Sequence, residues 1–190
     1  LDHAEELNID PDCIVLSGYS IGAMMALGLA FRLRRYGITP RGLSIVAPPC
    51  DDLASGPSAS ISFASENLGF EERVITWHSF FGSTNVANPA LSPAVVDVAR
   101  VLRAVEDLKG FPPVFMHIME SDPNRDEDLE FCSKLLAANV MTGIHLWPGT
   151  NHATFYSGPM YELKGKFYAE IMGDLKTLIE SDCRRPWSAE

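Results

Sequence analysis

The pentapeptide at residues 18–22, Gly-Tyr-Ser-Ile-Gly, constrains the fold of this chain more than any other feature. It follows a short apolar run at residues 13–16 and precedes a long apolar stretch at residues 23–36. The first run has the length of a strand and the second that of a helix. A G-x-S-x-G sequence between a strand and a helix predicts a turn so tight that Ser20 adopts strained backbone angles. Small residues two positions before and after the serine would avoid a clash there, and its hydroxyl would stand clear of the sheet.

Two later segments supply an acid and a histidine in the chain order Ser…Asp…His. Residues 111–123 predict a buried strand that ends in an acidic loop, with Asp122 just past its carboxyl end. Residues 143–147 predict the last strand, which leads into the loop that carries His152. Since α/β sheets place their working residues at the carboxyl ends of parallel strands, we expect Ser20, Asp122 and His152 to meet there.

These three residue types have a well-defined chemistry when they lie in line. A serine hydroxyl can attack a carbonyl carbon while the imidazole takes its proton, and the carboxylate orients the ring and stabilises its charged form. Three other carboxylates are alternatives to Asp122, but they fall in the first turn of a predicted helix, further from the strand end: Asp126, Glu127 and Asp128.

Several segments in this order resemble the hormone-sensitive-lipase-like esterases of the α/β-hydrolase superfamily. The resemblance runs from about Ala4 to about Tyr156. The segments that carry it are residues 10–12, 18–22, 91–93, 110–113, 121–127 and 148–152. It implies an α/β-hydrolase fold, with parallel strands flanked by helices. It also implies a serine carboxylesterase that acts on small or medium acyl esters without a cofactor.

The chain departs from that family's pattern at two places. Tyr19 and Ile21 replace the acidic and small residues that usually flank the serine, although the backbone N–H of Ile21 remains the implied oxyanion donor. The family's H-G-G-G-type loop lies far upstream of the serine, yet only 19 residues precede Ser20 and the chain has no Gly-Gly pair. We therefore expect residues 1–190 to form one partial domain, the C-terminal part of the fold.

Two other functions stay open on the sequence alone. A natural short form with incomplete catalytic machinery would be a binding or regulatory module. An amidase or formamidase would use the same three groups as an esterase.

Residues 50–89 interrupt the alternation of strands and helices. The family resemblance implies that an insertion here contributes to a cap over the site. Its aromatic residues either line an acyl or alcohol pocket or pack the insertion onto the core. The candidate pocket residues are Tyr19, Trp77, Phe80 and Phe81.

The composition excludes several partners. A formal net charge of −10 argues against nucleic acid or an anionic membrane surface as a partner. No apolar run is long enough to span a bilayer. The histidines lack the spacing of a zinc site, so no metal is expected. The four scattered cysteines favour reduced thiols and an intracellular setting. The sequence leaves the oligomeric state open.

Further elements follow from apolar spacing. The predicted strands cover residues 13–17, 42–47, 113–119 and 143–147, and His117 and His145 are expected to be packed or hydrogen-bonded within them. The helix after Ser20 is apolar nearly all round and is expected to be buried. Asn124 predicts the start of another helix, residues 160–181 predict the last one, and residues 2–8 predict the end of a helix.

Overall fold

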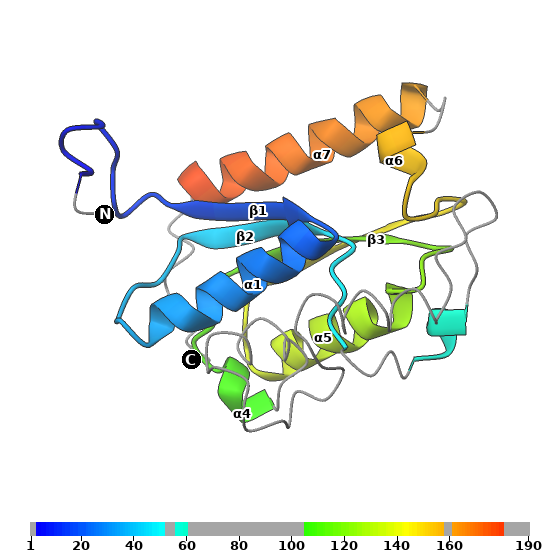
Figure 1. Ribbon diagram of the computed structural model, residues 1–190, viewed down its shortest axis with the longest axis horizontal. Coiled ribbons are helices and arrows are strands. Elements are labelled where there is room, and N and C mark those ends of the chain that lie inside the picture. The colour runs from blue at the N-terminus through cyan, green and yellow to red at the C-terminus, as the bar shows by residue number, and fades with distance from the viewer. Residues whose placement is uncertain (1–2, 52–55, 61–104, 158–160, 181–190) are drawn as a thin grey trace.

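The computed structural model describes residues 3–51, 56–60, 105–157 and 161–180 (Figure 1). Its centre is a four-stranded parallel sheet in the order β1-β2-β3-β4. The strands are β1 (Val15–Tyr19), β2 (Gly42–Val46), β3 (Val114–Met119) and β4 (Thr142–Trp147). All four predicted strands are confirmed to within two residues at each end.

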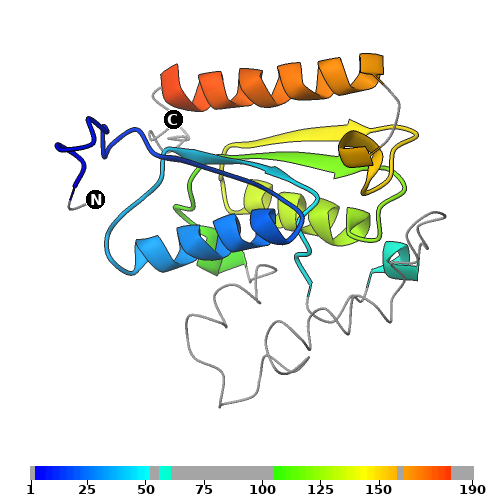
Figure 2. The ribbon, with the colours of Figure 1, turned by 45° about the horizontal axis from the view of Figure 1, so that its top comes forward.

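Helices cover both faces of this sheet (Figure 2). The longer ones are α1 (Ile21–Arg34), α5 (Arg125–Ala137) and α7 (Tyr161–Glu180). The shorter ones are η1 (Pro57–Ser60), α4 (Val105–Leu108) and α6 (Thr154–Ser157). Helices α1 and α5 lie on one face, and α7 crosses the other. Parallel neighbours need such crossover connections, because a tight turn cannot return the chain to the same end of the sheet.

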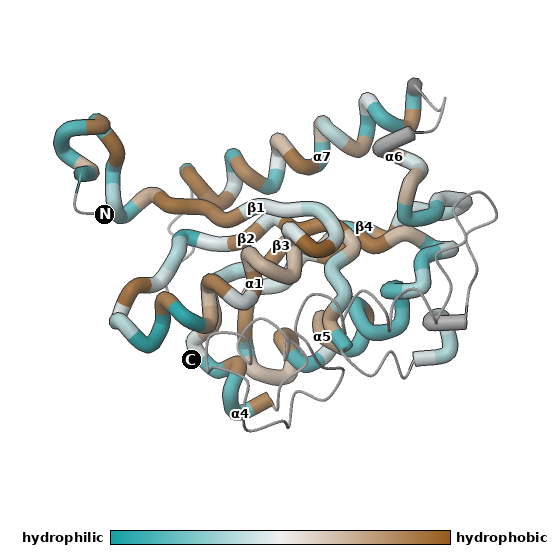
Figure 3. Tube along the Cα trace, in the orientation of Figure 1, coloured by the Kyte–Doolittle hydropathy of each residue, from teal (hydrophilic) through white to brown (hydrophobic). Residues whose placement is uncertain are grey.

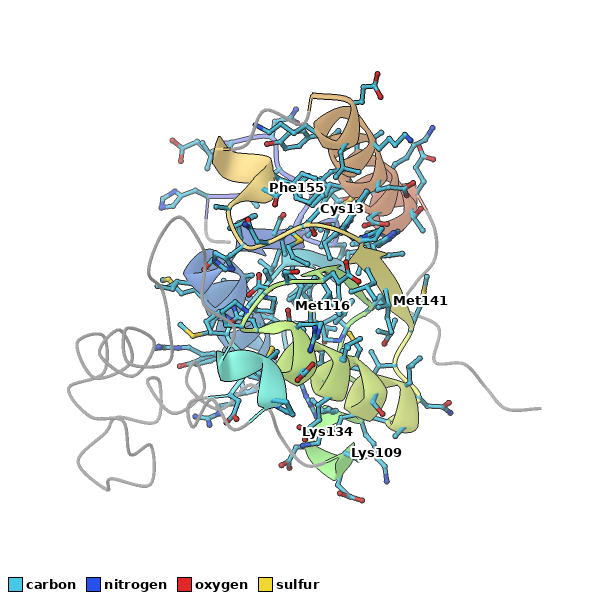
Figure 4. The ribbon with its side chains drawn as sticks, turned by 90° about the vertical axis from the view of Figure 1, so that its right-hand side faces the viewer. Cys13, Lys109, Met116, Lys134, Met141 and Phe155 are labelled. Atoms are coloured by element: carbon cyan, nitrogen blue, oxygen red, sulfur yellow. The ribbon has the colours of Figure 1, made fainter. Side chains whose placement is uncertain are left out.

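Hydrophobic residues run along the strands (Figure 3), and their side chains, which alternate between the two faces of the sheet, form two core clusters. One side of β2 and β3 packs against α1 and α5 through Leu43, Ile45 and Met116. The other side packs against α6 and α7 through residues that include Val46, Met119, Trp147, Phe155 and Phe167. In Figure 4, Met116 lies between the sheet and α5, whereas Phe155 lies on the α7 side.

Helix α1 is buried on one face only, which corrects the expectation of a helix buried all round. Ala23 and Leu27 are fully buried, but Met25 and Leu29 are 51% and 42% exposed. The exposed residues line a shallow apolar groove with Val15 and Leu16 along the outer edge of β1. In the part of the chain that the structure describes, no strand pairs with that edge.

The N-terminal residues differ from the sequence expectation. Residues 3–8 form turns rather than the end of a helix, and Asn8 has a positive φ of 54°. No described helix is both long and apolar enough to cross a membrane.

A buried polar cluster joins α7 to the two strands beneath it. Asp174 of α7 contacts His117 Nε2 at 2.7 Å and His145 Nε2 at 3.2 Å, and the two imidazole rings stack with centroids 4.5 Å apart. The indole N–H of Trp147 donates to His117 Nδ1 at 3.2 Å. Since Nδ1 is an acceptor in that bond, the proton of neutral His117 lies on Nε2 and is donated to Asp174. Both histidines are therefore hydrogen-bonded, as the sequence predicts.

This cluster predicts a large cost for removing Asp174. Asp174→Ala leaves the fully buried Nε2–H of His117 without its acceptor, so the free energy of unfolding should fall by about 2 kcal/mol. Lys176→Ala on the same helix is the matched control, because Lys176 is 71% exposed, and it should change that free energy by less than about 0.5 kcal/mol. Urea unfolding measures both values. Equal losses in the two variants would contradict a structural role for the cluster.

Candidate active site

Ser20 occupies the single residue between β1 and α1. Its φ and ψ are 53° and −124°, a conformation that non-glycine residues rarely adopt. Its backbone N–H donates to the carbonyl of Val46 at 2.8 Å, which ties the turn to the end of β2. The strained serine turn that the sequence predicts is therefore present.

The close approach of two backbone segments explains why residue 18 is a glycine. A Cβ atom at this position would lie 2.4 Å from the carbonyl carbon and oxygen of Gly22. Gly22 differs, because a Cβ there would have no described atom within 4 Å. Of the two glycines that flank Ser20, only Gly18 is thus required by close contact with described atoms, whereas the sequence predicts a steric need at both positions.

Asp122 lies in the loop after β3 and is fully buried. Its Oδ1 accepts the backbone N–H of Asn124 at 2.9 Å, and its Oδ2 lies 2.8 Å from His152 Nδ1. The alternative acids have other partners. Asp126 contacts Arg125 and Ser58, and Glu127 accepts the backbone N–H of Cys50.

His152 links the other two residues. Its Nε2 lies 2.8 Å from Ser20 Oγ, on the opposite side of the ring from Asp122. Because an ionised carboxylate only accepts hydrogen bonds, Nδ1 carries the ring proton and Nε2 is left to accept the serine hydroxyl. The structure thus brings Ser20, His152 and Asp122 into one hydrogen-bonded line.

The loop that carries His152 is held to the acid loop by short contacts. The backbone N–H of Ser121 donates to the carbonyl of Thr150 at 2.8 Å. The N–H of Gly149 donates to Glu120 Oε2 at 2.6 Å. Within the histidine loop itself, the Thr150 hydroxyl donates to the carbonyl of Trp147 at 2.6 Å. The loops that carry the imidazole and the carboxylate are therefore hydrogen-bonded to each other.

Comparison with known proteins identifies the family. The sequence profile described as the alpha/beta hydrolase fold matches residues 1–156. The chain belongs to the α/β-hydrolase family. This agrees with the range over which the sequence resembles hormone-sensitive-lipase-like esterases and confirms that resemblance.

Relatives of this α/β-hydrolase are esterases by name. An esterase of Acinetobacter venetianus is 26% identical over 147 residues, which cover 74% of this chain and 44% of the relative. The carboxylesterase/phospholipase LipF of Mycobacterium tuberculosis is 26% identical over 150 residues, which cover 79% of this chain and 39% of LipF. A bacterial heroin esterase is 27% identical with a TM-score of 0.81, covering 95% of this chain and 56% of that one. The chain spans about half the length of the relatives it matches.

Tyr19, a candidate pocket residue, lies against the histidine loop of the hydrolase site. Its hydroxyl donates to the backbone carbonyl of His152, and its ring meets the imidazole edge-on at a centroid distance of 5.5 Å. It therefore supports the position of His152. The other candidates, Trp77, Phe80 and Phe81, lie outside the described residues, as does nearly all of the predicted cap, so the acyl pocket stays a prediction.

Ile21 is the first residue of α1. A backbone N–H in the first turn of a helix has no carbonyl partner within that helix and can bind an anion. Its side chain packs against the core cluster beneath α1. This position suits the oxyanion role that the family resemblance implies.

His117, His145 and Asp174 form the one group of potential metal ligands among the described residues. The sequence did not reveal it, because the three residues come from β3, β4 and α7. Its hydrogen bonds argue against a metal. A histidine that binds a metal through Nε2 carries its proton on Nδ1, but the indole N–H of Trp147 points at Nδ1 of His117.

Two cysteines lie buried between the loop after β2 and α5. Burial raises the pKa of Cys50 well above its usual range, and the carboxylates of Asp128 and Glu127 raise it further. Burial, followed by the charge of Asp128, raises the pKa of Cys132 to about 12. Both thiols are therefore protonated near neutral pH, and neither is in a disulfide.

The strained turn predicts opposite outcomes at its two glycines. Gly18→Ala forces backbone atoms apart and should cost about 3 kcal/mol of stability or more, together with loss of the Ser20–His152 contact. Gly22→Ala meets open space in the first turn of α1 and should keep or raise the Tm, because alanine favours helix. Thermal unfolding followed by circular dichroism separates the two. A Gly22→Ala chain as unstable as the Gly18 variant would contradict this account.

The raised pKa values predict selective thiol reactivity. Iodoacetamide at pH 8 should alkylate the partly exposed Cys13 and leave Cys50 and Cys132 unmodified, because only the thiolate reacts. Peptide mass spectrometry identifies the modified positions, and the same reaction in urea should label all three. Equal labelling of Cys50 and Cys13 in the folded chain would be the opposite result.

Proposed function

We propose that this protein is a serine carboxylesterase that cleaves small or medium acyl esters through an acyl-enzyme intermediate. The observation that carries the proposal is the hydrogen-bonded line from Ser20 Oγ through His152 to Asp122. The serine at its head stands on the strained turn between β1 and α1.

In the first half-reaction, Ser20 Oγ attacks the ester carbonyl carbon while His152 Nε2 takes the hydroxyl proton. The positive imidazolium that results faces the buried carboxylate of Asp122, which stabilises it and fixes the ring. Negative charge develops on the carbonyl oxygen, where the backbone N–H of Ile21 is placed to donate. Collapse of the tetrahedral intermediate breaks the bond to the alkoxy oxygen, and His152 returns the proton to the leaving alcohol.

In the second half-reaction, water replaces the alcohol. His152 Nε2 removes a proton from the water as it attacks the acyl-enzyme, and the proton then passes to Ser20 Oγ when the carboxylic acid leaves. The scheme needs no cofactor.

The names of the relatives support an ester over an amide as the substrate. The A. venetianus protein, LipF and the bacterial heroin esterase are all named as esterases. An amidase or formamidase would use the same three groups, so rates on matched p-nitrophenyl esters and anilides compare the two directly.

A catalytically incomplete binding or regulatory module is the second candidate, which the sequence leaves open. Such a module would hydrolyse p-nitrophenyl acetate and butyrate no faster than buffer does.

A fluorophosphonate probe tests the proposal. Because the probe traps an activated serine, it should label Ser20, and Ser20→Ala should remove both the label and ester hydrolysis. In a chain that reacts with the probe and hydrolyses esters, Asp122→Asn should lower kcat by about 10⁴-fold before any labelling, since it disturbs the tautomer of His152. Ser17→Ala is the matched control, because Ser17 is an exposed serine on the same strand, and it should label as the unchanged chain does.

Labelling that persists in the Ser20→Ala chain would show that the nucleophile is another residue. A Ser20 that neither labels nor supports turnover would favour the binding module.

A further inference from the structure

The end of β2 supports both the nucleophile and the acid. The carbonyl of Val46 accepts the backbone N–H of Ser20, as described above. The next residue, Ala47, has a positive φ of 45° and is fully buried, and its N–H donates to the carbonyl of His117 on β3 at 2.9 Å. The left-handed conformation turns the chain out of the sheet at this point, where β2 has just ended.

Asn124 connects this turn to the acid loop. Its side-chain amide Nδ2 donates to the carbonyl of Ala47 at 2.9 Å, and its own backbone N–H donates to Asp122 Oδ1 at 2.9 Å. Only 5% of Asn124 is exposed. One residue therefore holds the carboxylate with its main chain and the end of β2 with its side chain.

The direction of this side chain is unusual for its place in the fold. Asn124 is the residue before the first turn of α5, where an asparagine side chain commonly caps its own helix. It makes no such capping bond here. The acidic residues of the first turn, Asp126, Glu127 and Asp128, stabilise that helix end instead. The amide is thus used for the contact with Ala47.

We propose that Asn124 is a positioning residue that fixes the Asp122 carboxylate relative to Ser20 through the carbonyl of Ala47. The path is short. Ser20 is hydrogen-bonded to Val46, which precedes Ala47 in the chain. Asn124 is hydrogen-bonded both to Ala47 and to Asp122. With Oδ1 held by the Asn124 N–H, Oδ2 is directed at His152 Nδ1. The effect of this bridge on catalysis rests on the proposed function, whereas its hydrogen bonds do not depend on that function.

The proposal predicts a spectroscopic change that does not depend on turnover. A proton held between His152 Nδ1 and Asp122 should give a far-downfield, slowly exchanging resonance in ¹⁵N-histidine-labelled protein. Asn124→Leu keeps the size of the side chain but removes the donor, so this resonance should broaden or move upfield. Asn124→Ala, which introduces no bulk, should do the same.

Leu135→Ala is the control for a merely structural effect. Leu135 is a fully buried residue in the last turn of α5, at the end of the helix away from the acid loop, so its loss should lower the Tm and leave the resonance in place. In chains that turn over esters, the Asn124 variants should lower kcat by about 10- to 100-fold with little change in KM, as misplacement of a reacting group does.

Each outcome decides one point. A folded Asn124→Leu chain that keeps the unchanged resonance would overturn the proposal, as would an equal loss in Leu135→Ala. If the resonance is absent from the unchanged chain, the Asp122–His152 hydrogen bond on which the bridge acts is not formed, and the proposal is overturned. If the resonance behaves as expected while the phosphonate probe leaves Ser20 unlabelled, the positioning role stands and the proposed esterase function is wrong.

Discussion

The structure depends on the close backbone contact between the end of β1 and the first turn of α1. Gly18 lets the carbonyl of Gly22 approach to a distance that no side chain would permit. That approach forces Ser20 into its strained conformation and directs the axis of α1 back along the sheet. Once α1 lies there, its buried face fixes one layer of the core, and the parallel order of the remaining strands follows from similar crossovers.

The parallel order of the strands sets the geometry of the site, because the carboxyl ends of all four strands lie at the same edge of the sheet. Serine, acid and histidine follow β1, β3 and β4, and β2 contributes no reactive side chain. The carbonyl of Val46, the last residue of β2, nevertheless holds the serine turn, and that of Ala47, the next residue, holds the acid loop. A fully buried carboxylate such as Asp122 is tolerated because hydrogen bonds reach both of its oxygens.

Much of this could be predicted from the sequence. The strands, the helix after the serine and the meeting of Ser20, Asp122 and His152 follow from apolar runs and from the order of the loops. Contacts across elements could not be predicted in this way. In the sequence, Asp174 is one polar position of an amphipathic helix. Only the packing of α7 on the sheet brings its carboxylate into contact with both His117 and His145.

Three residues differ in detail from what their local patterns suggest: Asn124 begins α5 as predicted but does not cap it, and Met25 and Leu29 are not buried. Asn124 carries the signature of a helix cap, but its side chain donates to a carbonyl in the turn after β2 instead. Met25 and Leu29 are apolar, but they lie on the face of α1 that turns toward the outer edge of β1 rather than the core. Local patterns identify the kind of element and leave open what covers each of its faces.

The position of β1 makes the two halves of the site unequal. The acid and histidine loops are hydrogen-bonded to each other, and Asn124 ties the acid loop to the turn after β2. The nucleophile follows a strand whose outer edge has no partner strand among the described residues. A strand that paired with that edge would therefore contact the element that carries Ser20 and not the loops of Asp122 and His152.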